Sequence, residues 1–325
     1  MRPYHMRNKF LSYLKNILYR EPSFILRYYL HRDKKGKESY KSAMFFMADG
    51  RMEHGGLFDR LKGAVSIYAV SKIMNKEFGI HFAAPFQLEK YLAPHSYDWS
   101  KDDNIIYSYP SSRPIIAYSE TENPRRLFKK RICQTHFYYG YDIIDYINQK
   151  YTCSYDWVTL FNELFAPTAY LKDYVNQVKC EIGSEYYAIH LRFQNLLGDK
   201  VELRKHPLLD EEKKNSLIAI CTNKIREIAS DNPLDWTPVI FSDSMIFIEE
   251  IKKKIPEVFI VPGSIQHIDS GKHTTEDENL KLFADVYLIA GAQKVYSIAG
   301  KGLYESAFPL YSAKIGNLPF DRVLL

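Results

Sequence analysis

The sequence predicts an α/β protein with two Rossmann-like domains that face a cleft. Its 325 residues are enough for two domains of ordinary size. Strand patterns alternate with helix patterns in the second half of the chain, and a less regular version occurs in the first half. The predicted organisation is a basic leader over residues 1–41, an N-terminal α/β domain over 42–180 and a C-terminal domain over 181–325.

The C-terminal half has the clearest rhythm of elements. Helices are predicted at 210–230, 245–256, 276–292 and 301–312, because apolar residues recur there at three- and four-residue steps. Strands are predicted at 185–193, 237–244, 257–263 and 293–300, with a last strand at 313–318. Such alternation is typical of βαβ units and a parallel sheet, whose ligands bind beyond the carboxyl ends of the strands.

The N-terminal half is less regular. An apolar segment at 42–50 precedes two glycines and a long helix pattern that begins at Leu57. A helix pattern at 154–183 is broken near Pro167 and leads into the second domain. Further strands are expected at 80–86, 104–110 and 113–120.

Gly55 and Gly56 stand directly before the long helix. One interpretation is a tight turn, since glycine permits backbone angles that other residues avoid. The other is a bare backbone that lets a phosphate or sugar approach the helix N-terminus. The two glycines alone do not decide between these interpretations.

The net charge of +5 is unevenly distributed. Residues 1–41 carry eleven Lys or Arg and three Asp or Glu, a net charge of +8, so the remaining chain carries −3. Basic and apolar residues alternate over 8–37, which is typical either of a peripheral helix on an anionic membrane surface or of a helical arm packed on the body. Nucleic-acid binding is not expected, because the body is acidic and has no recognised nucleic-acid motif.

Other sequence features point to the reducing interior of a cell. The four cysteines have no metal-ligand spacing and are expected to be free thiols. No apolar run reaches 18 residues, and the N-terminus does not resemble a signal peptide. We therefore expect a cytoplasmic protein, with the leader as the one candidate for contact with the inner face of the plasma membrane.

His190 and Arg192 share one face at the end of the first strand of the C-terminal domain. A charged guanidinium in an apolar strand requires an anionic partner. That partner could be an acidic side chain of the protein, or a diphosphate held by two parallel hydrogen bonds. Alone, His190 is expected to be a core histidine that orients its neighbours.

Two more strands of this domain end in residues suited to nucleotide binding. Ser242 and Asp243 close one strand, where a carboxylate can accept hydrogen bonds from a ribose or base or can cap the next helix. Gly300, Lys301 and Gly302 close another, where a plain turn is the alternative to a phosphate-binding helix start. Because these signals fall at one edge of one sheet, a nucleoside diphosphate site is favoured.

Taken in order, these motifs resemble those of the fucosyltransferase superfamily with the B-type glycosyltransferase (GT-B) fold, which includes the α1,2-, α1,6- and protein O-fucosyltransferases. The matching segments are GGLFDR at 55–60, HLR at 190–192, FSD at 241–243 and YSIAGKGLYESA at 296–307. The resemblance covers roughly residues 42–316 and identifies a distant, bacterial-type member.

The resemblance implies roles for individual residues. Arg192 would bind the donor diphosphate and stabilise the leaving group, with His190 beside it, and Asp59 completes the implied catalytic set. The implied donor-binding set is Gly55, Gly56, Arg60, Ser242, Asp243, Ser297, Gly300, Lys301 and Gly302. The implied reaction is metal-independent, inverting transfer of fucose from GDP-fucose to a hydroxyl of a glycan acceptor.

The sequence also departs from the family pattern. A second arginine and an immediate Gly-Asp are missing after HLR, with Gly198 and Asp199 appearing later, and AGKG replaces the serine-rich phosphate motif. Another nucleotide sugar as donor, or an inactive binding relative, therefore remain alternatives. An NAD-dependent oxidoreductase is disfavoured because no G-x-G-x-x-G run is present. Candidates for the general base are Glu53, Asp59, Asp199 and Glu202.

Overall fold

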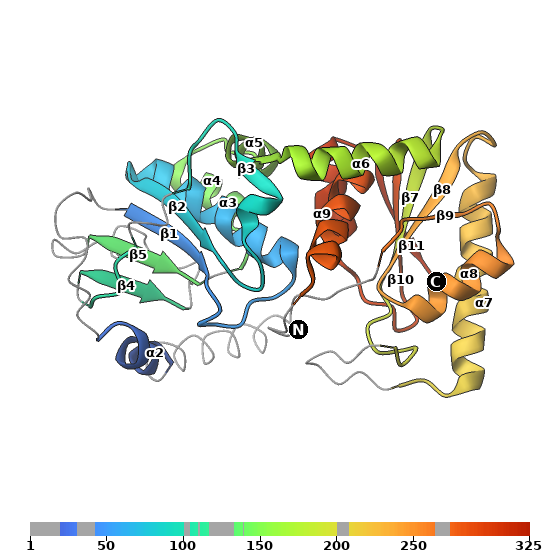
Figure 1. Ribbon diagram of the computed structural model, residues 1–325, viewed down its shortest axis with the longest axis horizontal. Helices are drawn as coiled ribbons and strands as arrows, with labels where there is room; N and C mark the ends of the chain where they lie inside the picture. Colours follow the sequence, from blue (N-terminus) through green and yellow to red (C-terminus); the bar gives the residue numbers. More distant parts are fainter. Residues whose placement is uncertain are drawn as a thin grey trace. The chain divides into compact units, whose positions relative to one another are not determined.

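The computed structural model divides the chain into two compact units (Figure 1). Unit 1 comprises Met1–Leu88 and Leu92–Ala166, and unit 2 comprises Glu89–Tyr91 and Pro167–Leu325. The structure describes residues 20–30, 43–100, 105–109, 111–116, 133–138, 140–199, 208–263 and 274–325. Most of the basic leader and the candidate base Glu202 therefore lie outside the described residues.

Unit 1 is built on a parallel four-stranded sheet of order β2-β1-β5-β4. Its strands are β1 (Ala43–Ala48), β2 (Glu77–Phe82), β4 (Ser112–Ile115) and β5 (Gln134–Phe137). The central strand β1 is buried along its whole length. Burial on both faces explains why it reads as a continuous apolar run rather than an alternating one.

The helices among the described residues of unit 1 are α2 (Glu21–Tyr28), α3 (Leu57–Met74), α4 (Ile144–Tyr151) and α5 (Trp157–Leu164). A 3₁₀ turn (Leu88–Lys90) precedes β3 (Leu92–Pro94), which pairs with β6 (Phe165–Pro167). The long helix α3 begins at Leu57, as the sequence predicts. It ends at Asn75, which adopts the left-handed conformation with φ 48°.

Unit 2 is built on a parallel five-stranded sheet of order β11-β10-β7-β8-β9. Its strands are β7 (Tyr186–Leu191), β8 (Thr237–Ser242), β9 (Phe259–Ile260), β10 (Val295–Ala299) and β11 (Phe320–Leu324). Its helices are α6 (Ala169–Ile182), α7 (Glu211–Ser230), α8 (Met245–Lys254), α9 (Glu276–Ala290) and α10 (Ala307–Gly316). The predicted parallel α/β class is confirmed in both units.

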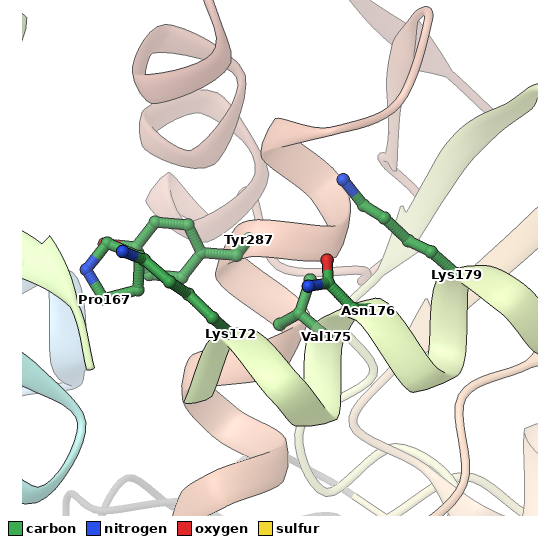
Figure 2. A pocket seen from close by; sticks show the side chains of 6 residues that line it. All are labelled: Pro167, Lys172, Val175, Asn176, Lys179 and Tyr287. Atoms are coloured by element: carbon green, nitrogen blue, oxygen red, sulfur yellow. The ribbon is translucent and has the colours of Figure 1, made fainter. Parts of the chain in front are cut away.

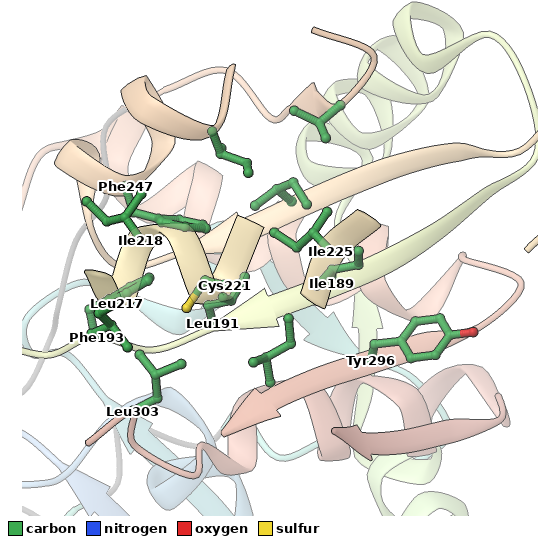
Figure 3. Packing of buried hydrophobic residues seen from close by; sticks show 14 of the residues in the cluster. Ile189, Leu191, Phe193, Leu217, Ile218, Cys221, Ile225, Phe247, Tyr296 and Leu303 are labelled. Atoms are coloured by element: carbon green, nitrogen blue, oxygen red, sulfur yellow. The ribbon is translucent and has the colours of Figure 1, made fainter. Parts of the chain in front are cut away.

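Helix α7 covers one face of the unit 2 sheet (Figure 3). Leu217, Cys221 and Ile225 face strand β7 and pack in one cluster with Ile189 and Leu191. Each of these side chains is at least nine-tenths buried. The three- and four-residue spacing of apolar residues in this segment therefore reports the face that packs on the sheet.

The unit boundary differs from the sequence-based one. The compact units divide at Ala166–Pro167, whereas the sequence suggests residue 180. Thr168 caps α6 by accepting a hydrogen bond from Leu171 N, and α6 ends at Gly183 with φ 72°. The break near Pro167 is confirmed, but the helix after it packs against α9 and belongs to unit 2.

The end of the chain corrects two predictions. The helix expected at 301–312 is α10 at 307–316, and the strand expected at 313–318 is β11 at 320–324. Gly300, Lys301 and Gly302 have φ values of 97°, 48° and 95°, which a right-handed helix cannot contain. The helix instead begins after Ser306, whose hydroxyl accepts a hydrogen bond from Phe308 N.

The structure of unit 1 corrects other predicted elements. Residues 105–109 contain no strand, so the strand expected at 104–110 is wrong over that range. Strands expected at 80–86 and 113–120 correspond to β2 and β4 with shifted bounds, whereas β5 and α4 were not predicted. Four-residue strands such as β5 carry too little periodicity for a reading of one sequence.

Candidate functional site

The carboxyl end of β7 holds the central residues of the predicted donor site. Arg192 follows the strand directly, and its side chain is 18% exposed. The guanidinium carbon lies 5.0 Å from the centre of the Tyr304 ring, and the Arg192 carbonyl accepts a hydrogen bond of 2.9 Å from Tyr304 N. The strand end and the loop before α10 are thus joined, with a cation held at the edge of the sheet.

His190 is a buried neighbour of this arginine. Its ring stacks on Phe308 of α10, with 5.9 Å between centroids and 24° between planes. Ser297 lies opposite His190 in the register of β7 and β10 and is also buried. Both residues therefore lie inside the sheet layer, whereas Arg192 reaches its surface.

Asp243 follows β8 and organises the turn after β7. Its Oδ1 accepts a hydrogen bond of 2.6 Å from Phe193 N, and its Oδ2 accepts one of 2.9 Å from Gln194 N. Arg192 Nε lies 4.0 Å from the same Oδ2. Gln194 has φ 55°, so the carboxylate stabilises an otherwise unfavourable backbone turn. The structure thus brings Arg192 and Asp243 together, as the sequence predicts.

The helix cap near this point belongs to Ser244, which corrects the alternative reading of Asp243 as the cap. Ser244 Oγ accepts a hydrogen bond from Phe247 N at the start of α8. Asp199 Oδ2 accepts hydrogen bonds from Ser244 Oγ at 2.8 Å and from Ile246 N at 3.1 Å. Asp199, one of the candidates for the general base, thus lies at the N-terminus of α8, where the helix dipole favours a negative charge.

The loop after β10 has little resemblance to a helix start. Gly300 lies close to Leu325, because a Cβ at Gly300 would come within 3.3 Å of Leu325 N. At Gly302 a Cβ would touch Leu196 at 3.4 Å. Lys301 is exposed on this loop. The loop supplies a cation and a glycine-dependent backbone at the edge of the sheet, without a helix N-terminus.

In unit 1, Gly55 and Gly56 stand before α3, as predicted, but not to make a left-handed turn. Gly56 has φ −59°, and Gly55 has no left-handed φ either. A Cβ at Gly55 would clash with Asp59 Oδ2, which shows that the Asp59 carboxylate occupies that space. Asp59 also pairs with Lys62 at 2.8 Å. The first glycine therefore makes room for an acidic side chain.

Arg60 is almost completely buried beneath this turn. Its Nε donates to the Gly55 carbonyl at 3.0 Å, and its Nη1 donates to the Ala84 carbonyl at 2.7 Å. The guanidinium carbon also lies 5.3 Å from the centre of the Phe82 ring. These contacts fix the loop before α3 to the loop after β2. Whether Arg60 contacts a donor stays a prediction.

A polar cluster at the carboxyl end of the unit 1 sheet was missed by the sequence analysis. Asp49 follows β1, and its Oδ2 accepts hydrogen bonds from Arg51 Nη1 at 2.5 Å and from the hydroxyls of Tyr107 and Tyr138, each at 2.9 Å. Burial alone would raise the pKa of Asp49, but the hydrogen bonds from Arg51 and Tyr138 outweigh it and lower the pKa. The carboxylate is therefore ionised at neutral pH.

Two histidines lie beside this carboxylate and stay neutral. Burial lowers the pKa of His136 to about 3, and the ring nitrogen Nδ1 is 2.7 Å from the Tyr29 hydroxyl. Burial and the nearby Arg60 charge lower the pKa of His54 to about 4. His54 adjoins the two glycines in the sequence, and this adjacency was the one signal that could have drawn attention to it.

A shallow pocket lies between α6 and α9 of unit 2 (Figure 2). Lys172 and Lys179 project from α6 on either side of Asn176, and the ring of Tyr287 from α9 lies near Lys172. The Tyr287 hydroxyl is buried and has no hydrogen-bond partner among the described residues. None of the sequence-predicted site residues lines this pocket, which is also lined by Pro167 and Val175.

The described part of the chain contains no group of three or more His, Cys, Asp or Glu residues placed to hold a metal ion. Within the same residues, no helix has the length and apolar character needed to cross a bilayer. All four cysteines are free. Contact of residues 8–37 with a membrane stays a prediction, because only α2 and its flanks are described in that range.

No protein-family model matches this chain, and no curated protein sequence matches it. Solved structures do match. The α-1,6-fucosyltransferase NodZ co-crystallised with GDP superposes with a TM-score of 0.54 and 13% identity, over 85% of this chain and 92% of that one. The chain shares the fold of NodZ. NodZ soaked with GDP-fucose gives a TM-score of 0.53 over 84% of this chain and 92% of that one, again at 13% identity.

NodZ from Bradyrhizobium without a named ligand matches equally well, with a TM-score of 0.53 and 13% identity. The resemblance to fucosyltransferases suggested by four short motifs is therefore confirmed for the fold. NodZ and this chain differ at most positions, so the likeness establishes the architecture, and the chemistry has to be argued from the residues of this chain.

Proposed function

We propose that this chain is a glycosyltransferase that transfers fucose from GDP-fucose to a hydroxyl group of a glycan acceptor. The observation that carries the proposal is the partly exposed Arg192 guanidinium at the carboxyl end of the central strand β7. Parallel α/β sheets bind their ligands at this edge. The NodZ structures of the same fold, one with GDP and one soaked with GDP-fucose, support the choice of donor.

In this proposal, Arg192 binds the diphosphate of the donor. A guanidinium can donate two parallel hydrogen bonds to phosphate oxygens, which fixes orientation as well as charge. Asp243 accepts hydrogen bonds from the two backbone amides that directly follow Arg192 and so positions the arginine. Lys301 on the neighbouring loop adds a second positive charge at the same edge of the sheet.

The proposed reaction inverts the anomeric carbon and uses no metal ion. The bond between the anomeric carbon and the phosphate oxygen breaks, and its electron pair leaves with GDP. The acceptor oxygen forms the new bond to the anomeric carbon from the opposite side and gives its proton to a general base, for which Glu53, Asp59, Asp199 and Glu202 are the candidates. Negative charge grows on the departing diphosphate, so a fixed cation such as Arg192 contributes about 3–4 kcal/mol to the transition state.

A thermal-shift titration with GDP, UDP, CDP, ADP and their common sugars tests the proposal. The full-length chain should be stabilised by GDP and GDP-fucose, since ligand binding to the folded state raises the melting temperature. In Arg192→Ala the GDP affinity should fall about 10- to 100-fold, the loss expected for hydrogen bonds to a charged group. Arg226→Ala is the matched control, because Arg226 binds the Lys254 carbonyl at the end of α8.

The possible outcomes separate the alternatives. Stabilisation by a different nucleotide would keep the proposed site and change the donor. Stabilisation by GDP that is equal in the Arg192→Ala and Arg226→Ala variants would show that the donor binds elsewhere. If no nucleotide stabilised the wild-type chain, the glycosyltransferase proposal would be wrong, and an inactive binding protein would replace it.

A further inference from the structure

The imidazole of His54 has an unused hydrogen-bond acceptor. The ring lies between Phe46 and Tyr138, with centroid distances of 6.0 Å and 6.3 Å. One ring nitrogen is hydrogen-bonded to the backbone of Met47. The other, Nε2, is buried and has no partner among the described residues.

The protonation state of the ring follows from its surroundings. With a pKa of about 4, His54 is neutral at pH 7 and carries one ring proton. Since Nε2 has no partner, Nδ1 carries this proton and donates to the Met47 carbonyl. The Nε2 atom then presents a lone pair and can only accept a hydrogen bond.

Buried acceptors without a donor are uncommon in folded proteins. His54 itself is half-buried, and its neighbours Glu53 and Gly55 are exposed, so the ring lies next to the surface rather than in the centre of the core. Nε2 has no exposed surface of its own, so a group from outside the protein supplies the missing donor once the exposed chain beside the ring, at Glu53 and Gly55, moves aside. At neutral pH this group is not a carboxylate or a sulfate, because these anions have no proton to donate to the Nε2 lone pair.

A hydroxyl group meets the requirement, and the surroundings favour a compound with several of them. Arg51 lies on the Tyr107 ring at 3.8 Å, and one of its nitrogens donates to Asp49. Its side chain is 31% exposed. Tyr138 connects the two features, because its ring stacks on His54 and its hydroxyl donates to Asp49. The carboxyl end of the unit 1 sheet thus offers an acceptor, His54 Nε2, and a partly exposed donor, Arg51, beside aromatic rings.

We propose that His54 Nε2 accepts a hydrogen bond from a hydroxyl of a saccharide bound at the carboxyl end of the unit 1 sheet, with Arg51 donating to a neighbouring oxygen of the same sugar. Neighbouring sugar hydroxyls donate and accept, which matches this pair of side chains. The inference deepens the proposed function, since the saccharide would be the glycan acceptor. His54 acts here as a binding residue that selects a hydroxyl over an anion.

Nitrogen NMR of the wild-type full-length chain tests the proposal without altering the fold. The chain is labelled with ¹⁵N-histidine, and the His54 resonances are assigned by their loss in His54→Gln. The probes are the methyl glycosides of glucose, galactose, mannose and N-acetylglucosamine, at up to about 50 mM to detect weak binding. At least one should move the Nε2 resonance in the direction of hydrogen bonding, whereas inorganic sulfate, which has no proton to donate, should not.

Two results would overturn the proposal. One is an Nε2 resonance that no glycoside moves, which would leave a fixed water molecule as the partner of this atom. The other is a shift by sulfate as large as that by any glycoside, which would contradict the argument that an anion without a donor is disfavoured.

A variant pair sharpens the result. His54→Phe keeps a ring between Phe46 and Tyr138 but removes the acceptor, so the affinity for the responding glycoside should fall at least about fivefold. His95→Gln is the control, because His95 is a histidine of unit 1 whose Nδ1 contacts the Asn162 carbonyl at 2.6 Å. Equal affinities in both variants would contradict the proposal.

Failure of this inference is distinguishable from failure of the proposed function. GDP binding and its dependence on Arg192 are measured without a saccharide, whereas the His54 resonance is measured without a nucleotide. If GDP binds as expected and no glycoside moves Nε2, only the role of His54 is lost. If a glycoside binds and no nucleotide does, the chain is a saccharide-binding protein and the transferase proposal falls.

Discussion

The two parallel sheets end in aspartates that are used differently. After β1 of unit 1, Asp49 accepts hydrogen bonds mainly from the side chains of an arginine and two tyrosines. After β8 of unit 2, Asp243 accepts hydrogen bonds from two backbone amides, and the nearby Arg192 Nε is 4.0 Å away. The Asp49 carboxylate thus holds side chains together, whereas the Asp243 carboxylate fixes the backbone of a turn.

This difference indicates which kind of ligand the carboxyl end of each sheet can bind. In unit 1 the Asp49 carboxylate holds the guanidinium of Arg51 against the Tyr107 ring. The side chains of this hydrogen-bonded network therefore form the surface at the end of the sheet. In unit 2 two backbone amides donate to the carboxylate, and Arg192 Nε lies 4.0 Å from it. A diphosphate suits the second arrangement, and neutral hydroxyls suit the first.

Removing the two carboxylates should give the largest effects. Asp49→Ala should destabilise unit 1 by about 3 kcal/mol, the lower end of the cost of breaking a buried ion pair, since Arg51 is partly exposed. Asp243→Ala should destabilise unit 2 by about 2 kcal/mol, because two buried backbone amides lose their acceptor. Urea unfolding followed by tryptophan fluorescence measures both changes.

The three tryptophans allow each unit to be followed separately. Trp99 and Trp157 lie in unit 1, and Trp236 lies in unit 2, so Trp236→Phe leaves reporters in unit 1 alone. The control is Asp59→Ala, which removes a half-exposed ion pair and should cost less than about 1 kcal/mol. A larger loss of unfolding free energy in Asp243→Ala than in Asp49→Ala would contradict the expectation that Asp49 stabilises its unit more than Asp243 does.

Acid should weaken unit 1 through its buried histidines. His136 and His54 have folded pKa values of about 3 and about 4, below the value of about 6.5 in an unfolded chain. Between these values the unfolded chain binds a proton that the folded chain does not, so stability falls as the pH decreases below 6.5. From pH 7.5 to 5, each histidine should remove about 2 kcal/mol.

Unfolding of the Trp236→Phe chain at pH 7.5, 6 and 5 measures this loss. Asp49 remains ionised at pH 5, because its pKa lies below the ordinary 3.8. His136→Gln cannot titrate and should reduce the loss by about half, whereas the exposed control His95→Gln should keep it. An unchanged pH dependence in His136→Gln would mean that this histidine is not buried in its neutral form.

The sequence is informative wherever a pattern is local. Helix α3 and the elements from β7 to α9 follow from apolar spacing, and the end-of-strand rule brings Arg192 and Asp243 together. Helix α10 is displaced because three consecutive left-handed residues follow β10, and the two glycines did not reveal that Lys301 shares their conformation. Local pattern cannot distinguish a glycine turn from a glycine helix start.

The unit 1 cluster could not be found in this way. It joins Asp49, Arg51, Tyr107 and Tyr138, to which Tyr29 and, through Tyr29, His136 are hydrogen-bonded, so residues more than a hundred positions apart meet. No spacing rule connects such residues, and their meeting depends on β1 lying between β2 and β5. The donor-site candidates, by contrast, stand at the ends of consecutive, well-patterned strands.

Glycine substitutions at the two edges should have the smallest effects and sharpen the comparison further. Gly302→Ala places a side chain at φ 95° and should cost about 1–2 kcal/mol in unit 2, because this conformation is unfavourable for alanine. Gly55→Ala keeps an ordinary φ and conflicts with the Asp59 carboxylate, which can rotate away from Lys62 at less than about 1 kcal/mol.

A double-mutant cycle between Gly55→Ala and Asp59→Ala tests this explanation of the first glycine. The two changes should not add, since removing the carboxylate removes the closest contact that the new methyl group would make. Urea unfolding of the single and double variants in the Trp236→Phe chain gives the coupling. Additive costs, or a Gly55→Ala cost above that of Gly302→Ala, would show that the backbone at Gly55 requires glycine for its own conformation. In that case the turn before α3, rather than the space taken by Asp59, would explain the glycine pair.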